Sequence, residues 1–354
     1  MKNYAIIKAD VESDKDIILS ILQRNFDGPF SWRTPHDSQR YDWSYKQCPY
    51  GNALCWLAKF ESTNSFVGSV SLFPRKLLIN EKPICSGILG DFAVDENHRG
   101  YGPALKLQRE VLSKVNDFGY IFNYAAPNKF GAPILLRVGY KEIGKYKVYI
   151  KPLKTVIVPR KYLPRYLQSN ILLKIIDFFI SIVSKEKRIK DKFGYSIEMP
   201  DLFDERFDVL WEKASKQFNI IGERSSKFLN WRYRQSYIHD YKIFCILDDK
   251  KELGGYIVYF VKDNICHVAD MLFLPSDNST NLLLAKFILY LRAKETGAIV
   301  IQYMGNSFIE KKLKEFDFFP KEEDEIIVLY VADLPLESYL LNETNWYFFA
   351  GDLD

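Results

Sequence analysis

The segment GILGDFAVDENHRGYGPALKLQREVLSKV, which spans Gly87–Val115, predicts a strand, a polar turn and a helix in succession. Its first part, Ile88–Val94, is apolar except at Asp91, as expected of a buried strand. After the turn, leucines and valines recur at helical spacing as far as Val115. Such a turn directs backbone N–H groups and the positive end of a helix dipole at one point, and that point suits a phosphate group.

The turn contains two glycines and a proline that fit this role. Gly100 and Gly102 leave the backbone without a Cβ atom where a ligand would approach. Pro103 fits the first turn of a helix, where its missing N–H breaks no intrahelical hydrogen bond. Two glycines before a helix are a weak signal, because many strand-to-helix turns need glycine. The longer pattern Arg99-x-x-Gly102-x-Ala104 is more specific.

This pattern, directly after a strand, resembles the acyl-CoA pyrophosphate loop of the GNAT N-acetyltransferase superfamily. The family's loop reads Gln/Arg-x-x-Gly-x-Gly/Ala, and the strand before it holds the pantetheine arm. The resemblance implies acetyl-CoA or another acyl-CoA as co-substrate. Carried over onto this sequence, the residues expected to bind it are Phe92, Ala93, Val94, Arg99, Gly100, Tyr101, Gly102, Ala104, Leu105, Asn128 and Phe130.

The order of predicted elements over residues 1–150 also resembles this family. A first strand and helix precede several strands, the glycine turn with its helix, a strand at Gly119–Ala125, a short helix at Ala132–Arg137 and a last strand through Tyr149. Many family members carry on the short helix a tyrosine that protonates the departing thiolate. Here that position is Leu135, so this general acid is absent or comes from elsewhere.

Asp91 is the candidate general base. Attack of an amine on a thioester requires a group that accepts a proton, and Asp91 is the one carboxylate in an otherwise apolar strand. We expect partial burial to raise its pKa into a range useful for a base. The resemblance agrees, since a carboxylate on this strand often has that role in the family. The alternative is a structural aspartate bonded to the backbone or to Tyr45. Candidate contacts to the acceptor substrate are Trp32, Tyr45 and Asp270.

The composition argues against several other classes of protein. The chain has 354 residues, 47% of them hydrophobic, which is enough for two domains with cores of their own. A net charge of +4 is too small to favour nucleic acid as a partner. Five scattered cysteines without a C-x-x-C pair fit neither a disulfide framework nor a metal site. We therefore expect that the protein uses no metal. The N-terminal residues lack the apolar region of a signal peptide, so we expect a cytoplasmic protein.

Residues 153–192 form the predicted linker between two domains. Three prolines between positions 152 and 164, together with several basic residues, mark the boundary. The apolar stretch Asn170–Ser184 follows, but it contains charges and is shorter than the roughly 20 residues that span a membrane. Basic residues flank it on both sides. Segment 165–192 therefore contacts the inner face of the membrane peripherally or docks as a helix across the two domains.

The second half repeats much of the first. Asn230-Trp231-Arg232-Tyr233 echoes Asp42-Trp43-Ser44-Tyr45, and further matches follow in the same order. One feature is missing, because Leu274–Thr280 stands where the arginine and glycine loop would be and contains no glycine. The second copy is therefore expected to lack the phosphate site.

The predicted fold class is α+β, with two tandem GNAT-like domains of mixed, mostly antiparallel sheet flanked by helices. We expect an acyl-CoA-binding domain over residues 1–152, the linker over 153–192 and a degenerate GNAT-like domain over 193–354.

These features predict an N-acyltransferase that moves an acetyl or other acyl group from acyl-CoA to an amine. The sequence around Gly102-Pro103-Ala104-Leu105 and the aromatic, then acidic tail resemble tandem GNAT-like proteins of bacterial polysaccharide biosynthesis, which implies an amino sugar, free or lipid-linked, as acceptor. Two alternatives stay open. One is a peptidoglycan-type transferase that uses aminoacyl-tRNA, against which the Arg99–Ala104 loop argues. The other is a non-catalytic sugar-binding or scaffold protein, which Leu135 favours. The sequence does not predict the oligomeric state.

Overall fold

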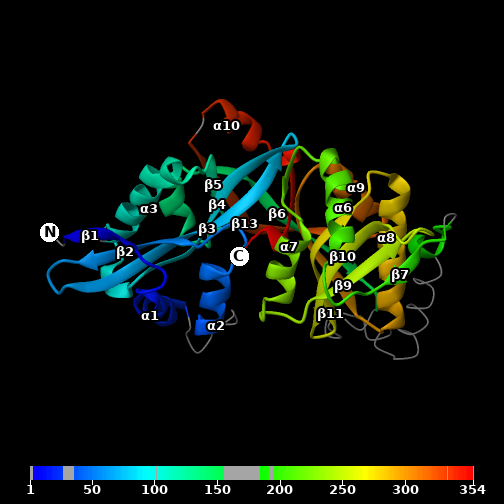
Figure 1. Ribbon diagram of the computed structural model, residues 1–354, viewed down its shortest axis with the longest axis horizontal. Coiled ribbons are helices and arrows are strands. Elements are labelled where there is room, and N and C mark those ends of the chain that lie inside the picture. Colours follow the sequence, from blue (N-terminus) through cyan, green and yellow to red (C-terminus); the bar gives the residue numbers. More distant parts are fainter. Residues whose placement is uncertain are drawn as a thin grey trace, which may run out of the picture.

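One mixed sheet runs through the whole molecule, with helices on both of its faces (Figure 1). The computed structural model describes residues 3–26, 36–100, 102–154, 184–191, 194–332 and 334–353. We call the part up to Pro152 the first half and the part from Ser184 onward the second half. The N-terminal residues lie at one end of the molecule, whereas the C-terminal residues lie near its middle, between the two halves (Figure 1).

The first half begins with an antiparallel meander and ends with a long strand. Its elements are β1 (Tyr4–Ala9), α1 (Lys15–Phe26), α2 (Ser38–Tyr41), the π-helical turn η1 (Asp42–Lys46), β2 (Leu54–Phe60), β3 (Ser65–Ile79), β4 (Lys82–Val94), the 3-10 turn η2 (Glu96–His98), α3 (Pro103–Lys114), the 3-10 turn η3 (Val115–Phe118), β5 (Phe122–Ala125), α4 (Ala132–Arg137) and β6 (Lys141–Pro152).

The second half follows a similar order. Its elements are η7 (Lys185–Lys187), β7 (Ser196–Glu198), α6 (Glu205–Ala214), η8 (Ser215–Gln217), β8 (Ile220–Gly222), α7 (Ser226–Leu229), the π-helical turn η9 (Asn230–Arg234), β9 (Lys242–Leu247), β10 (Leu253–Lys262), β11 (Ile265–Phe273), α8 (Asp277–Ala293), β12 (Ala298–Gly305), α9 (Ser307–Glu315), β13 (Phe319–Val331), α10 (Leu334–Leu340), η10 (Glu343–Asn345), β14 (Trp346–Phe349) and η11 (Ala350–Asp352).

The two halves share strands at the centre of the sheet. The order of the main path is β1-β2-β3-β4-β5-β13-β6-β12-β11-β10-β9-β7. Strand β13 belongs to the second half, yet it lies between β5 and β6 of the first half and is antiparallel to both. Strand β6 in turn pairs with β12 of the second half. Strands therefore pair across the sequence position at which we predicted the domain boundary.

Alternating side chains along the strands build a core on each face of the sheet. On β2, Trp56 and Ala58 join the apolar cluster that includes Leu107 of α3, whereas Cys55 and Leu57 join the cluster that includes Ile18 of α1. Since successive side chains of a strand point to opposite faces, α1 and α3 cover opposite faces of the first half. Figure 1 shows α3 and α1 on either side of these strands.

A reciprocal pair of tryptophans joins the halves. The Trp43 indole Nε1 donates to the Trp231 carbonyl oxygen at 2.8 Å, and the Trp231 Nε1 donates to the Trp43 carbonyl oxygen at 3.1 Å. Their rings stack with centroids 5.2 Å apart. Each ring also has a guanidinium over it, that of Arg232 over Trp43 and that of Arg75 over Trp231. This contact relates the turns η1 and η9, the segments whose sequences resemble each other.

Candidate active site

Short pairing between β4 and β5 leaves an opening in the hydrogen bonding of the sheet in the first half. The two strands are parallel and pair only at Gly87 with Asn123 and at Ile88 with Tyr124. Beyond Ile88, the remaining residues of β4 have no partner on the side of β5 among the described residues. Polar backbone groups along that edge are therefore free to bond a ligand, as an unpaired strand edge does in other proteins.

A β-bulge distorts β4 beside this opening. Ser69 of β3 pairs with Ala93 and Ser71 pairs with Gly90, so β4 holds an extra residue between these pairs. Asp91 lies in the bulge with a φ of +45°, a left-handed conformation that is uncommon for a residue other than glycine. Bulges of this kind turn a side chain or a backbone amide to a direction that a regular strand does not allow.

The glycine loop follows at the C-terminal end of β4. Gly100 and Gly102 have φ values of +81° and +99°, and a Cβ atom added at either would meet nothing within 4 Å, so both face open space. Gly102 is the N-cap residue of α3, and no side chain bonds this end of the helix. Among the described residues, no acceptor takes the amide protons of Gly100 and Gly102. Tyr101, a predicted cofactor contact, lies outside the described residues.

The corresponding helix of the second half, α8, has a different N-terminus. The Ser276 hydroxyl oxygen caps it by accepting from the Ser279 amide at 3.1 Å. One of the amides that would bind an anion is therefore already bonded within the protein. The N-terminus of α3 differs, because no side chain caps it at Gly102.

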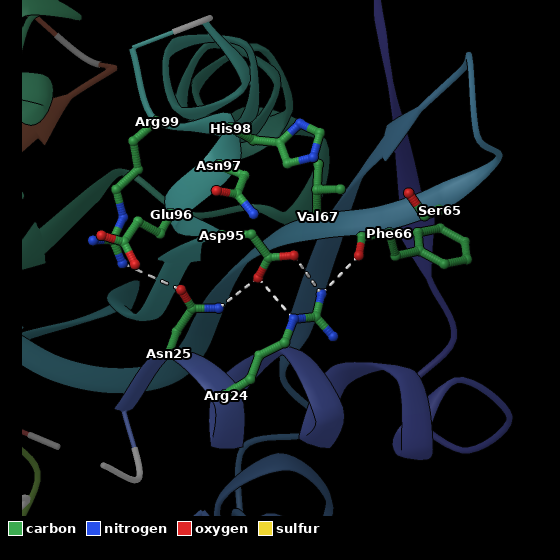
Figure 2. A pocket seen from close by; sticks show the side chains of 10 residues that line it. All are labelled: Arg24, Asn25, Ser65, Phe66, Val67, Asp95, Glu96, Asn97, His98 and Arg99. Atoms are coloured by element: carbon green, nitrogen blue, oxygen red, sulfur yellow. Dashed lines mark hydrogen bonds and ion pairs between the residues drawn. The ribbon is translucent and has the colours of Figure 1, made fainter.

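Arg99 supports the loop from behind. Its Nε donates to the Val94 carbonyl oxygen at 3.0 Å, and its Nη2 lies 3.3 Å from Oδ1 of Asn25 on α1. Figure 2 shows Arg99 joined to Asn25, which in turn donates to Asp95 at 2.8 Å. Arg24 forms a two-bond ion pair with the same Asp95, at 2.7 and 2.8 Å. The side chain of Arg99 thus ties the loop to α1, which leaves the backbone amides as the donors for a phosphate.

A shallow hollow of about 640 Å³ lies beside this network. Residues of α1, the start of β3 and the segment after β4 line it: Arg24, Asn25, Ser65, Phe66, Val67, Asp95, Glu96, Asn97, His98 and Arg99 (Figure 2). The hollow reaches the glycine loop, because Arg99, the residue before Gly100, is part of its lining.

Asp91 lies in a dense set of polar contacts. Arg40 donates to both of its carboxylate oxygens at 2.9 Å, and the Tyr45 hydroxyl donates to Oδ2 at 2.9 Å. The His36 Nε2 lies 3.5 Å from Oδ1. Neither Arg40 nor His36 was predicted from the sequence. A signal was present, because Asp37-Ser38-Gln39-Arg40 has the pattern of a capped helix start. In the structure, Asp37 caps α2 by accepting from the Arg40 amide.

The predicted rise of the pKa of Asp91 is wrong. Burial by itself raises this pKa, but the adjacent Arg40 guanidinium and the His36 imidazole outweigh burial and hold the pKa well below the usual value of an aspartate. A carboxylate that is both strongly acidic and bonded by three side chains is a poor proton acceptor. The structure therefore favours the alternative, in which Asp91 is a structural residue bonded to Tyr45.

The candidate contacts to the acceptor need correction as well. Tyr45 is 0% exposed and stacks on Tyr41, and Asp270 is 1% exposed, so neither side chain is at a surface that an acceptor reaches. Asp270 bonds Arg224 and the Tyr256 hydroxyl at 3.1 and 3.0 Å. Burial raises the pKa of Asp270 to about 6, although Arg224 opposes the rise. The third candidate, Trp32, lies outside the described residues.

The other predicted cofactor residues have varied surroundings. Ala93 and Val94 are buried in β4, and Phe92 is half-buried. The side-chain oxygen of Asn128 accepts from the amides of Phe130 and Gly131 at 3.0 and 2.9 Å, so it shapes the turn before α4. Phe130 is 75% exposed.

Three further observations concern the side chains and helices of the described residues. The described residues contain no group of three or more His, Cys, Asp or Glu side chains that could hold a metal ion. None of the described helices has the length and apolar character needed to cross a membrane. Leu135 is 1% exposed on α4, so no polar group occupies the position of the family's general acid.

Comparisons with known proteins place the fold. No protein-family model matches the sequence, and no curated protein matches it. Solved structures do match. One is a conserved protein of unknown function from Enterococcus faecalis V583, a probable N-acyltransferase, with a TM-score of 0.68 and 12% identity over 94% of this chain and 73% of that chain.

Two other structures are similar over the same length. A GCN5-related N-acetyltransferase from Anabaena variabilis ATCC 29413 has a TM-score of 0.65 and 14% identity, covering 94% of this chain and 74% of that chain. The N-myristoyltransferase of Saccharomyces cerevisiae with bound myristoyl-CoA has a TM-score of 0.58 and 11% identity, covering 93% of this chain and 82% of that chain. These likenesses confirm the predicted fold class: the chain has a GNAT-like α+β fold.

Proposed function

We propose that this protein is an N-acyltransferase that moves an acyl group, most simply acetyl, from acyl-CoA to an amine. The glycine loop at the start of α3 carries the proposal. Gly100 and Gly102 lie at the positive end of a helix, beyond the unpaired edge of β4, and no acceptor among the described residues takes their amide protons. A pyrophosphate fits the first feature, and an extended pantetheine chain with its amides fits the second.

The bulge of β4 supplies the second part of the proposed chemistry. Attack of an amine on a thioester builds negative charge on the carbonyl oxygen, and a backbone amide directed at that oxygen stabilises it. The bulge at Asp91 turns backbone amides out of the regular ladder at the place where the thioester would lie between β4 and β5. In this account Asp91 keeps the bulge in shape, and a group of the acceptor or water takes the proton.

The second half supports the first in this proposal. We propose two tandem copies of the same fold, an acyl-CoA-binding domain over residues 1–152 and a degenerate one over 193–354, joined by the linker. The equivalent turns η1 and η9 and the reciprocal bonds of Trp43 and Trp231 support a duplication. The cap of Ser276 on α8 supports the loss of the phosphate site from the second copy.

For the acceptor we propose an amino sugar of surface polysaccharide biosynthesis, on the resemblance of the loop and of the tail. Release of CoA thiol from acetyl-CoA, measured with glucosamine, a nucleotide-linked amino sugar and a lysine peptide, tests this class. Turnover with an amino sugar above that with the peptide is the expected result. Turnover with the peptide alone contradicts the acceptor class but leaves acyl transfer standing.

Calorimetric titration with acetyl-CoA and with myristoyl-CoA tests the co-substrate and the acyl chain at once. We expect binding of acetyl-CoA with a dissociation constant in the micromolar range. A protein that binds neither thioester is no acyl-CoA enzyme, and binding of aminoacyl-tRNA in the same assay would then favour the peptidoglycan type of transferase. Binding of free amino sugar without either thioester would favour the non-catalytic alternative.

A further inference from the structure

We propose that Tyr237, a residue of the second half, is a positioning residue for the bulge of β4. The inference rests on the proposed function, in which that bulge directs backbone amides at the thioester. Tyr237 acts through a chain of contacts that passes from Asp37 to Arg40 and ends at Asp91. The second half would thereby set the geometry of a site whose co-substrate contacts all lie in the first half.

The first contact joins the two halves. The Tyr237 hydroxyl donates to Oδ1 of Asp37 at 2.7 Å, in a part-buried position. The same oxygen accepts from the Arg40 backbone amide at 2.8 Å. Burial raises the pKa of Asp37, but the Arg40 amide and the Tyr237 hydroxyl outweigh it, and the pKa lies below the usual value of an aspartate. Asp37 therefore stays ionised at neutral pH and holds both donors.

The second contact is the start of a short helical segment. Helix α2, Ser38–Tyr41, continues directly into η1, and a segment this short depends strongly on what its N-terminal end bonds. Asp37 is its N-cap residue, and loss of such a cap destabilises the start of a helix. Elsewhere α2 is held by the Tyr41 hydroxyl, which donates to the Val11 carbonyl oxygen at 2.8 Å. Tyr237 thus constrains the N-terminal end of α2 through Asp37, which also bonds the Arg40 amide.

The third contact reaches the bulge. Both terminal nitrogens of Arg40 bond the Asp91 carboxylate at 2.9 Å, and the two side chains are 14% and 6% exposed. A two-bond pair of this kind fixes direction as well as distance. Asp91 holds a φ of +45°, which costs energy for an aspartate and persists only while its surroundings enforce it. A small displacement of α2 is therefore passed to the amides that follow Asp91.

Other neighbours of Asp91 come from the same segment. His36 precedes Asp37, and Tyr45 lies in η1 directly after α2. Both move with the segment that Asp37 anchors. Other restraints on the segment are the bond from the Gln23 side chain to the His36 carbonyl oxygen at 2.8 Å and the bonds from the Lys15 ammonium to the Ser38 hydroxyl and the Asp42 carboxylate at 2.7 and 2.8 Å. Because these restraints remain when Tyr237 loses its hydroxyl, we expect a change in the bulge without unfolding.

The decisive variant is Tyr237→Phe, which removes one hydroxyl and keeps the ring. Its matched control is Tyr339→Phe, since the Tyr339 hydroxyl also makes one bond between separate elements, to Oδ1 of Asn80 at 2.6 Å, on an exposed part of the molecule. A 1 Å misplacement in an active site costs as much as about 100-fold in rate. We expect the kcat for CoA release from acetyl-CoA, with glucosamine present, to fall about 10-fold in Tyr237→Phe only, with the KM for acetyl-CoA unchanged.

Amide hydrogen exchange tests the inference without reference to catalysis. Exchange at Gly90–Ala93 should accelerate in Tyr237→Phe and stay as in wild type in Tyr339→Phe. Equal exchange in both variants would overturn the inference, even if wild type proves active. Faster exchange in a protein that binds no acetyl-CoA would sustain the mechanical link and refute the proposed function instead.

A double-mutant cycle tests the route. Asp37→Asn keeps an acceptor oxygen and should behave nearly as wild type, whereas Asp37→Ala should reproduce the accelerated exchange. If Tyr237 acts through Asp37, adding Tyr237→Phe to Asp37→Ala has no further effect. Additive effects of the two substitutions would show that Tyr237 acts by another path and would contradict the proposal.

Discussion

At the scale of single residues, the ion pair between Arg40 and Asp91 is expected to contribute strongly to the free energy of unfolding. Both side chains are mostly buried, so removal of one leaves an unpaired charge, which typically costs about 3–5 kcal/mol. We expect Arg40→Met to lower the free energy of unfolding at neutral pH by about 3 kcal/mol in denaturant titration. Adding Asp91→Asn to Arg40→Met should recover most of the loss. A double variant as unstable as the single one would contradict this account.

The same pair predicts a pH dependence. The pKa of Asp91 is lower in the folded protein than in the unfolded chain, where it is about 3.9. The unfolded chain therefore takes up this proton first as the pH falls, so the stability from Asp91 is present above pH 3.9 and lost below it. We expect thermal melts of Asp91→Asn to decline less steeply than those of wild type between about pH 5 and pH 3. Parallel declines would mean that Asp91 is not charged in the folded state.

At Gln108 on α3 we expect a substitution to stabilise the protein rather than to destabilise it. Its side chain is 0% exposed, and neither of its amide atoms has a hydrogen-bond partner among the described residues. Such groups cost about 1–3 kcal/mol, so Gln108→Met should raise the melting temperature. The control is Gln217→Met, because the Gln217 amide donates to the Phe273 carbonyl oxygen at 2.9 Å and its loss should destabilise. If Gln108→Met also destabilises, its amide is bonded within the protein.

Residue patterns predicted one side of the site and missed the other. Gly100, Gly102 and the place of Asp91 follow from the strand, turn and helix pattern, because local backbone chemistry decides them. The partners of Asp91 do not, since His36 and Arg40 come from a segment without periodic apolar residues. The sign of the pKa change of Asp91 depends on those partners, and a sequence reading that saw only burial predicted it wrongly.

At the scale of elements, apolar periodicity predicted strands and helices well where turn residues mark their ends. The predicted helix Ala132–Arg137 agrees with α4, and the predicted strand Gly119–Ala125 contains β5. Helix α8 begins at Asp277, because the cap of Ser276 starts it within Leu274–Thr280, the segment that stands in place of the glycine loop. Helix α2 and the turn η1 were not predicted, since their stability comes from contacts with distant residues such as Trp231.

The predicted linker can be tested by shortening it. The apolar part of segment 165–192 lies largely outside the described residues, so its contact with a membrane stays a prediction. Arg292 contacts the linker near both of its ends, because it donates to the Leu153 carbonyl oxygen at 3.0 Å and to the Glu186 carboxylate at 2.9 Å. Replacing residues 155–183 with a short flexible linker should therefore leave acetyl-CoA binding and the melting temperature unchanged.

Sedimentation with vesicles that contain anionic lipid then tests the membrane contact. We expect the wild-type protein to sediment with such vesicles and the shortened protein to stay in solution. Equal sedimentation of both proteins would end the proposal of a membrane contact through this segment.

At the scale of the whole molecule, the shared strands couple the two halves. The sequence predicted two units divided along the chain, and nothing local in Phe319–Val331 indicates that this strand would pair with β5 and β6. Strand exchange between halves is set by long-range pairing, which periodicity does not detect. Through this pairing, β5 and β6 of the first half are joined by a strand of the second half.

A fragment experiment tests this coupling. Residues 1–154 contain every predicted cofactor residue but lack β13, so β5 and β6 would have an open gap between them. We expect this fragment alone to be insoluble or to bind no acetyl-CoA, and to regain binding when residues 184–354 are expressed with it. Full affinity in the isolated fragment would show that β13 is dispensable for the site.

The most direct test of the central claim compares two glycines. Gly102 and Gly119 both have positive φ values, +99° and +71°, and a Cβ atom at either would meet nothing within 4 Å. Glutamate therefore introduces a similar backbone strain and the same charge at both, but only Gly102 lies in the proposed phosphate loop. Titration calorimetry with acetyl-CoA should show at least a 100-fold loss of affinity in Gly102→Glu and wild-type affinity in Gly119→Glu. Equal affinities in the two variants would contradict the assignment of the loop to acyl-CoA.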